Sequence, residues 1–252
     1  MAKQESLVKF RGKVGDLSFT KHRTRGYEVR MRGGVDKARI MSDPNFERTR
    51  ENMSEFGMAA KTAKLIRVQL NNLMRGMADK TFRNRLTSVV NRIIKMDSEN
   101  MRGQRVFQPE NSGRLKGFEF NAKSSLEFMF SGILISAFDR ATGEVSLVIP
   151  DFDPRREVTL LPEATHIRFT LAAVEQTLDP EVVPRPLVQQ SDYIQLIDAH
   201  VEETIQVSLP AASDKVVYII VGIETFLESN GVHYPLKNNP YNAMTIVDVD
   251  IP

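Results

Sequence analysis

Apolar and polar residues alternate in the first forty positions with the period of two that is typical of β-strands. The alternation runs from Leu17 to Lys21 and again from Tyr27 to Met31, with a short connection that contains Gly26 between the two runs. This pattern predicts a β-hairpin. An isolated hairpin is only marginally stable in water, so we expect this one to pack against its own β domain or a neighbouring subunit.

The apolar spacing then changes to three and four, the period of an α-helix. Asp43 and Pro44 are a typical helix start, and we expect a helix of about nine turns that reaches Met77. Asp79 is expected to cap a second helix, and Gly76 lies either in a bend between the two or within a continuing helix. The first apolar stripe consists of Phe46, Met53, Phe56, Ala60, Ala63, Ile66, Leu70, Leu73 and Met77. The second consists of Phe82, Leu86, Val89, Ile93 and Met96.

Short apolar runs separated by turns recur from Gly113 onwards. They predict strands at residues 126–130, 133–138, 144–149, 166–174, 193–209, 215–226, 232–236 and 244–250. Strands at this spacing are typical of a β-sandwich, either immunoglobulin-like or of jelly-roll type. The sequence therefore predicts an α+β protein in three parts: a basic β-hairpin arm (residues 1–40), a helical region (41–112) and an acidic β-sandwich domain (113–252).

The net charge of +2 hides an uneven distribution along the chain. Residues 1–122 hold 26 Lys and Arg against 13 Asp and Glu, a net charge of +13. Residues 123–252 hold 8 Lys and Arg against 19 Asp and Glu, a net charge of −11. Such asymmetry indicates a region that binds a polyanion or two surfaces that attract each other. Docking of the two parts within one chain is a further alternative.

The sequence holds no motif of a known catalytic or metal site. It has no cysteine, which excludes disulfides, thiolate nucleophiles and cysteine-ligated metals. Residues 151–153 offer two carboxylates but lack the further oxygen ligands that calcium needs. The glycine-rich nucleotide motifs and the Gly-x-Ser-x-Gly motif are absent. Four histidines lie far apart in sequence, without the close partners of a zinc site: His22, His166, His200 and His233. We therefore expect a protein that is not an enzyme and holds no cofactor or metal.

The start of the chain lacks the apolar stretch of ~7–15 residues that a secretory signal needs. No run of ~18 apolar residues occurs, so we expect no membrane partner. The sequence predicts a protein that is cytoplasmic as synthesised, and release into a particle or an extracellular assembly remains an alternative.

The stretch from Arg39 to Gly57, which contains Asp-Pro-Asn-Phe-Glu-Arg-Thr-Arg-Glu-Asn-Met-Ser-Glu-Phe-Gly, resembles the signature of a family of uncharacterised proteins common in Bacteroidota. The segments 10–15 and 239–244 are similar to the same family, and the likeness covers nearly the whole chain. The family has no established activity. The resemblance implies a bacterial origin and no catalytic residues.

Together these features predict a structural subunit that assembles with copies of itself into a filament, tube or particle, such as a virion or tail component. The basic half of one copy is expected to contact the acidic β domain of the next, and such head-to-tail contacts form rings or open filaments. The alternative is a nucleic-acid-associated protein that uses the basic half. The candidate interface residues are Phe19, Arg23, Arg25, Tyr27, Arg30, Arg32, Phe46, Phe56, Leu70 and Leu73.

Overall fold

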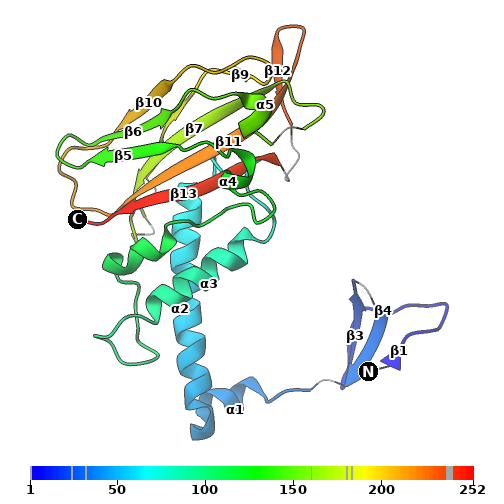
Figure 1. Ribbon diagram of the computed structural model, residues 1–252. Helices are drawn as coiled ribbons and strands as arrows, with labels where there is room; N and C mark the ends of the chain where they lie inside the picture. The colour runs from blue at the N-terminus through cyan, green and yellow to red at the C-terminus, as the bar shows by residue number, and fades with distance from the viewer. Residues whose placement is uncertain are drawn as a thin grey trace. The chain divides into compact units, whose positions relative to one another are not determined.

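The computed structural model describes residues 2–23, 25–31, 33–159, 161–179, 181–182, 184–236 and 241–252 (Figure 1). The chain forms two compact units, Met1–Arg50 and Glu51–Pro252. The predicted boundary at residue 112 does not separate compact units, because helices and strands on its two sides share one core. The fold is α+β, as the sequence predicted.

The first unit contains a small antiparallel sheet with strand order β1-β4-β3-β2. The predicted hairpin is confirmed, since Leu17 pairs with Met31 and His22 pairs with Gly26. The sequence did not predict the two short outer strands. The elements of this unit are β1 (Ala2–Lys3), β2 (Gly12–Val14), β3 (Leu17–His22), β4 (Gly26–Met31), the helix α1 (Lys37–Ser42) and the 3-10 turn η1 (Pro44–Phe46).

The two predicted long helices are present as α2 (Glu47–Gln69), which starts in the first unit, and α3 (Phe82–Ile94). The expected continuation of the first helix to Met77 is wrong, because residues 70–77 form turns and Gly76 adopts a φ of +88°. Such a backbone conformation favours glycine and does not continue a helix. Asp43 caps η1, through a hydrogen bond that its carboxylate accepts from the Asn45 N–H, instead of capping α2 directly.

The second unit contains two antiparallel sheets. The smaller has the order β10-β6-β5; the larger has the order β12-β11-β7-β8, with β13 paired to β11 and β9 paired to β7. β10 lies beside β8, and β5 lies beside β13, so the strands curl into a half-barrel (Figure 1). The strands are β5 (Ile135–Asp139), β6 (Glu144–Ile149), β7 (His166–Glu175), β8 (Leu187–Gln190), β9 (Ile194–Gln195), β10 (Glu203–Ser208), β11 (Val217–Ser229), β12 (Val232–Pro235) and β13 (Ala243–Asp250).

The central strand β11 is buried on both faces. Tyr218 and Ile220 belong to a core shared with α2 and α3. Ile219 and Val221 belong to a second core that includes the inward side chains of β6 and β10. The sheet therefore lies between the helices and the smaller sheet. Gly222 leaves room for this packing, because a Cβ there would come within 2.7 Å of the Met77 Sδ.

Short helical segments of this unit include η2 (Pro109–Leu115), α4 (Leu126–Met129) and α5 (Pro154–Glu157). The predicted strand at 126–130 is wrong, because Ser125 accepts a hydrogen bond from the Phe128 N–H and starts α4 there. The predicted strand at 193–209 is two separate strands, β9 and β10.

Candidate interaction surfaces

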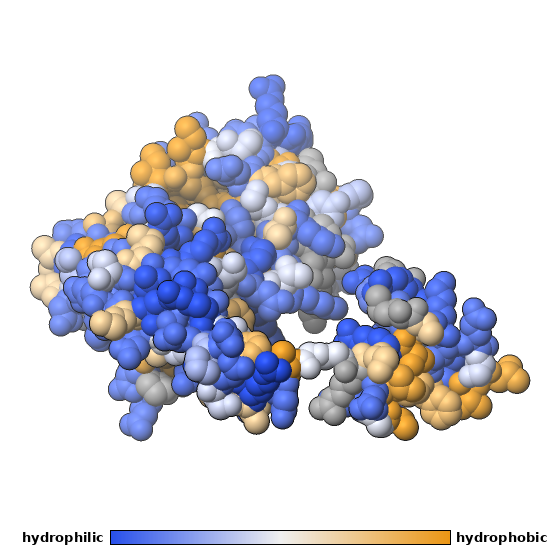
Figure 2. Space-filling model, turned by 90° about the horizontal axis from the view of Figure 1, so that it is seen from below, coloured by the Kyte–Doolittle hydropathy of each residue, from blue (hydrophilic) through white to orange (hydrophobic). Residues whose placement is uncertain are grey.

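The small sheet of the first unit has an apolar face that the unit itself covers only in part, through a contact of the Phe10 ring with Phe19 and of Arg11 with Tyr27. Phe19 and Tyr27 lie on it, as do Val14, Leu17, Val29 and Met31, because alternate residues of paired strands share a face. Val14 and Met31 are 65% and 75% exposed. No apolar side chain among the described residues of this unit is buried. Figure 2 shows hydrophobic side chains gathered on one side of the unit.

The basic candidates of the arm surround this sheet. Arg23 lies in the connection between the two hairpin strands, and Arg30 is exposed on β4. Arg25 forms an ion pair with Glu28 at 3.0 Å. Tyr27 lies beneath the cation of Lys21, with the Lys21 Nζ 5.4 Å from the ring centroid. Arg32 lies outside the described residues.

The candidate interface residues of the helical region divide into an exposed group and a buried group. Phe56 on α2 is 57% exposed, and Phe46 at the end of η1 is half-buried. Leu70 and Leu73 are buried in the core against the large sheet. They therefore offer no surface to another molecule and do not belong to the candidate interface. Packing within the chain explains the first apolar stripe, since the later residues of that stripe pack on the chain's own large sheet.

The acidic half offers a sheet edge. Among the described residues, β5 pairs only with β6, so its other edge, on the side of β13, carries no ladder of backbone hydrogen bonds. Ile133, two residues before β5, and Ile135, at its start, are 78% and 57% exposed. Exposed edge strands are templates for pairing with another chain.

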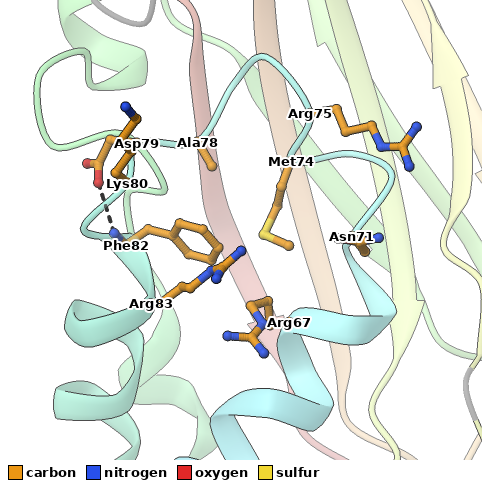
Figure 3. Close-up of a pocket in the computed structure, with 9 residues that line it drawn as sticks. All are labelled: Arg67, Asn71, Met74, Arg75, Ala78, Asp79, Lys80, Phe82 and Arg83. Atoms are coloured by element: carbon orange, nitrogen blue, oxygen red, sulfur yellow. Dashed lines mark hydrogen bonds between the residues drawn. The ribbon is translucent and has the colours of Figure 1, made fainter.

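Basic side chains from two helices line one pocket, and sequence reasoning missed its location. A pocket of about 390 Å³ lies between the end of α2 and the start of α3. Its lining residues are Arg67, Asn71, Met74, Arg75, Ala78, Asp79, Lys80, Phe82 and Arg83. Figure 3 shows the guanidinium groups of Arg67 and Arg83 pointing into the same space, while Arg75 projects outwards from the loop.

Of the described residues that line this pocket, only Asp79 carries a carboxylate, and that group is bound to other partners. Asp79 accepts hydrogen bonds from the N–H groups of Phe82 and Ala122, and its Oδ2 lies 2.7 Å from an Arg85 nitrogen. Burial alone would raise the pKa of Asp79, but the hydrogen bonds from Ala122 and Thr81, with the Arg85 charge, outweigh it and lower the pKa to about 2. Asp79 is thus ionised, and Arg85 balances its charge.

The structure brings together two histidines that the sequence separates. The ring centroids of His166 and His233 lie 4.6 Å apart, and the ring of Tyr193 stacks on His233 at 3.8 Å. Burial lowers the pKa of His166. Within the described part of the chain, no group of three or more His, Cys, Asp or Glu side chains is placed to hold a metal ion.

The remaining candidates have local structural roles. His200 is half-buried, with its ring centroid 5.0 Å from that of Phe152. Asp153 caps α5 through a hydrogen bond from the Arg155 N–H. None of the helices in the described ranges is both long enough and apolar enough to cross a membrane.

Comparison with known proteins gives no relative: no family model, no curated protein and no solved structure matches the chain.

Proposed function

We propose that the protein is a non-enzymatic structural subunit that assembles with copies of itself into a filament, tube or particle. The observation that carries this proposal is the sheet of the first unit, on whose apolar face no described apolar side chain is fully buried. Ordering each residue costs about 1–2 kcal/mol in backbone entropy. Burial of apolar surface offsets that cost by about 25 cal/mol per Å². A second copy supplies the surface that the arm itself lacks.

Charge and strand edges indicate where the arm binds. Residues 1–40 hold 11 Lys and Arg against 4 Asp and Glu, a net charge of +7. Residues 123–252 have a net charge of −11, with 8 Lys and Arg against 19 Asp and Glu, and they include the free edge of β5. An arm that adds to this edge in the next copy makes a head-to-tail contact, which leads to a ring or an open filament.

The proposal also covers the type of β-sandwich and the family. We propose an immunoglobulin-like or jelly-roll sandwich for residues 113–252, because side chains of the two sheets share one core. We also propose membership of the uncharacterised Bacteroidota family, on the motif from Arg39 to Gly57. A virion or tail component is one form that such a subunit takes, made in the cytoplasm and released with its particle.

The test uses two matched variants in strand β3 of the full chain. Leu17→Asn/Phe19→Asn removes two side chains from the apolar face, whereas Ser18→Asn/Thr20→Asn makes the same number of changes on the opposite face. Burial of a large apolar side chain contributes about 1.5–3 kcal/mol, so the first variant should weaken assembly more than a hundredfold. The control should assemble like the wild type. Light scattering over a wide concentration range measures both.

Two further treatments separate the causes of assembly. Removal of residues 1–40 should leave a folded but unassembled protein. Added salt should weaken assembly only in part, because buried apolar contacts and strand hydrogen bonds are screened less than exposed charges. A wild type that stays monomeric at low and physiological salt contradicts the proposal. So does an apolar-face variant that assembles as well as its control.

Association with nucleic acid is the second candidate function. It is favoured by the basic half, with a net charge of +13 from 26 Lys and Arg against 13 Asp and Glu in residues 1–122. Phosphate contacts are the main source of sequence-independent affinity for nucleic acids. Assembly that disappears on nuclease treatment would favour this function over direct contact between subunits.

A further inference from the structure

Two arginines of the second unit converge on one pocket. Arg67 lies near the end of α2 and Arg83 near the start of α3, and both line the pocket of about 390 Å³ between these helices. Their guanidinium groups point into the same space (Figure 3). Because the two side chains come from different helices, the fold itself brings two positive charges together at this place.

Neither charge is balanced within the protein. Among the described residues, no carboxylate lies within ion-pair distance of Arg67 or Arg83. Asp79, which also lines the pocket, is bound to Arg85. Arg67 is half-buried, and withdrawal of a cation from water without a counter-charge is unfavourable. Like charges on both walls also repel each other. An anion bound between the two arginines relieves both effects.

The floor of the pocket orients Arg83. Its guanidinium carbon lies 5.9 Å from the centroid of the Phe82 ring, and Phe82 and Met74, which also lines the pocket, are both buried. A guanidinium group over an aromatic ring is attracted to the negative face of that ring. This contact directs the donors of Arg83 before any ligand binds.

We propose that this pocket binds the phosphate group of a small phosphate monoester. A guanidinium group donates paired hydrogen bonds to phosphate oxygens, so two of them match a group with three terminal oxygens. A monoester carries a charge of about −1.5 to −2 near pH 7, which balances two arginines, whereas a phosphodiester carries a single charge and offers fewer free oxygens. The volume of the pocket lies within the range of about 300–1,000 Å³ that is typical of small-molecule sites. Arg75 and Lys80 also line the pocket and add positive charge.

The pocket shares no residue with the arm or with β5, and phosphate binding does not require self-assembly. Either proposal can therefore fail while the other stands. The site also differs from the second candidate function, because the backbone of a nucleic acid consists of phosphodiesters.

The experiment uses the full chain and two variants that lose the same charge from the same helix. Arg83→Gln removes one guanidinium group from the pocket. Arg92→Gln is the matched control, because at about 3.6 residues per turn it lies on the opposite side of α3, and both residues are exposed. The probes are methyl phosphate, a monoester, and dimethyl phosphate, the corresponding diester. Phosphorus NMR of the probe, whose signal broadens on binding, measures the affinity in low salt whether or not the protein assembles.

The wild type should bind methyl phosphate at least tenfold more tightly than dimethyl phosphate. Arg83→Gln should bind methyl phosphate at least tenfold more weakly than the wild type, because charge-assisted hydrogen bonds to phosphate are lost. Arg92→Gln should bind it like the wild type. Arg67→Lys/Arg83→Lys keeps both charges but should still bind more weakly, since lysine lacks the forked donors. Affinity should also fall below about pH 6, where the monoester takes up a second proton.

Any of three results would overturn the proposal. The first is a wild type that does not bind methyl phosphate in low salt. The second is an Arg92→Gln variant that loses as much affinity as Arg83→Gln, since binding would then follow net charge alone. The third is tight binding of dimethyl phosphate, or of an oligonucleotide without a terminal phosphate, at the level of the monoester. That result would make the backbone of a nucleic acid the better ligand.

Discussion

His166 illustrates how pairing of distant strands builds a local environment. It lies at the start of β7, opposite Phe226 on β11, and β11 also pairs with β12, which carries His233. The charged groups nearest to this histidine pair are Arg168, whose guanidinium carbon lies 4.9 Å from the centroid of the Tyr193 ring, and Glu228. Because these residues lie far apart in the sequence, the sequence alone did not predict that they form a cluster.

The pH dependence of stability follows from these contacts. Burial and the neighbouring His233 lower the pKa of His166, while Glu228 acts in the opposite direction. Its pKa in the folded protein is therefore below the unfolded value of about 6.5. Its contribution to stability is complete above about pH 6.5 and is lost as the pH falls towards the folded pKa.

We therefore expect the free energy of unfolding to decrease on acidification from about pH 7.5 to about pH 5.5. His166→Asn should make this decrease smaller. Urea denaturation at each pH measures the effect. An equal decrease in the wild type and in His166→Asn would contradict this explanation.

Among the elements, α3 depends on one carboxylate at its start. Asp79 accepts hydrogen bonds from Phe82, at the beginning of the helix, and from Ala122, in the segment that approaches β13. It also forms the ion pair with Arg85. The same side chain therefore begins the helix and connects it to the chain beside the large sheet.

Replacement of Asp79 by alanine should lower the free energy of unfolding by about 2–4 kcal/mol, because it removes a cap and leaves Arg85 without its partner. The adjacent exposed residue provides a control, and Lys80→Ala should change the free energy by about 0.5 kcal/mol or less. Thermal or chemical denaturation of the two variants side by side is the measurement. A loss of similar size in both would contradict the role of Asp79.

The sequence predicts which side chains are buried better than it predicts where helices and strands begin and end. The spacing of apolar residues predicted that Leu70, Leu73 and Met77 are buried, and all three are. It did not predict that the helix ends at Gln69, because turns bury side chains as well as helices do. In the same way, Leu126 and Phe128 fit strand alternation, while the cap at Ser125 selects a short helix.

The candidate surfaces were predictable to different degrees. The apolar face of the arm follows from alternation, because both strands of the hairpin are regular. An apolar stripe on a helix does not reveal whether its own sheet or a neighbour covers it, so Leu70 and Leu73 were assigned to an interface. The basic pocket at the start of α3 has a sequence signal, the near absence of acidic residues between Glu55 and Asp97, but only the fold brings Arg67 and Arg83 to one pocket.

For the molecule as a whole, the shared core implies that residues 51–252 unfold together. Ile66 of α2 and Ile220 of β11 belong to one cluster of buried side chains. Ile66→Ala should therefore destabilise helices and strands alike, by about 2–5 kcal/mol. Met53→Ala, on the exposed part of the same helix, should cost far less.

Hydrogen exchange measures this coupling residue by residue. Backbone amides of β11 should lose as much protection as those of α2 in Ile66→Ala, because both exchange through the same global opening. Helical amides that lose protection while those of β11 keep it would show that the two layers unfold separately.

The position of β13 determines when this fold is completed during synthesis. Residues 243–250 pair with β11, and their other edge bonds to the segment at 117–120. At about 5–20 residues per second, a ribosome takes roughly 7–30 s to proceed from the end of α3 to this strand. Until then the helices lack the complete sheet on which they pack, while the arm has already emerged with its apolar face exposed. If the proposed assembly forms, nascent chains on one polysome would therefore present their arms before they present a finished acceptor sheet.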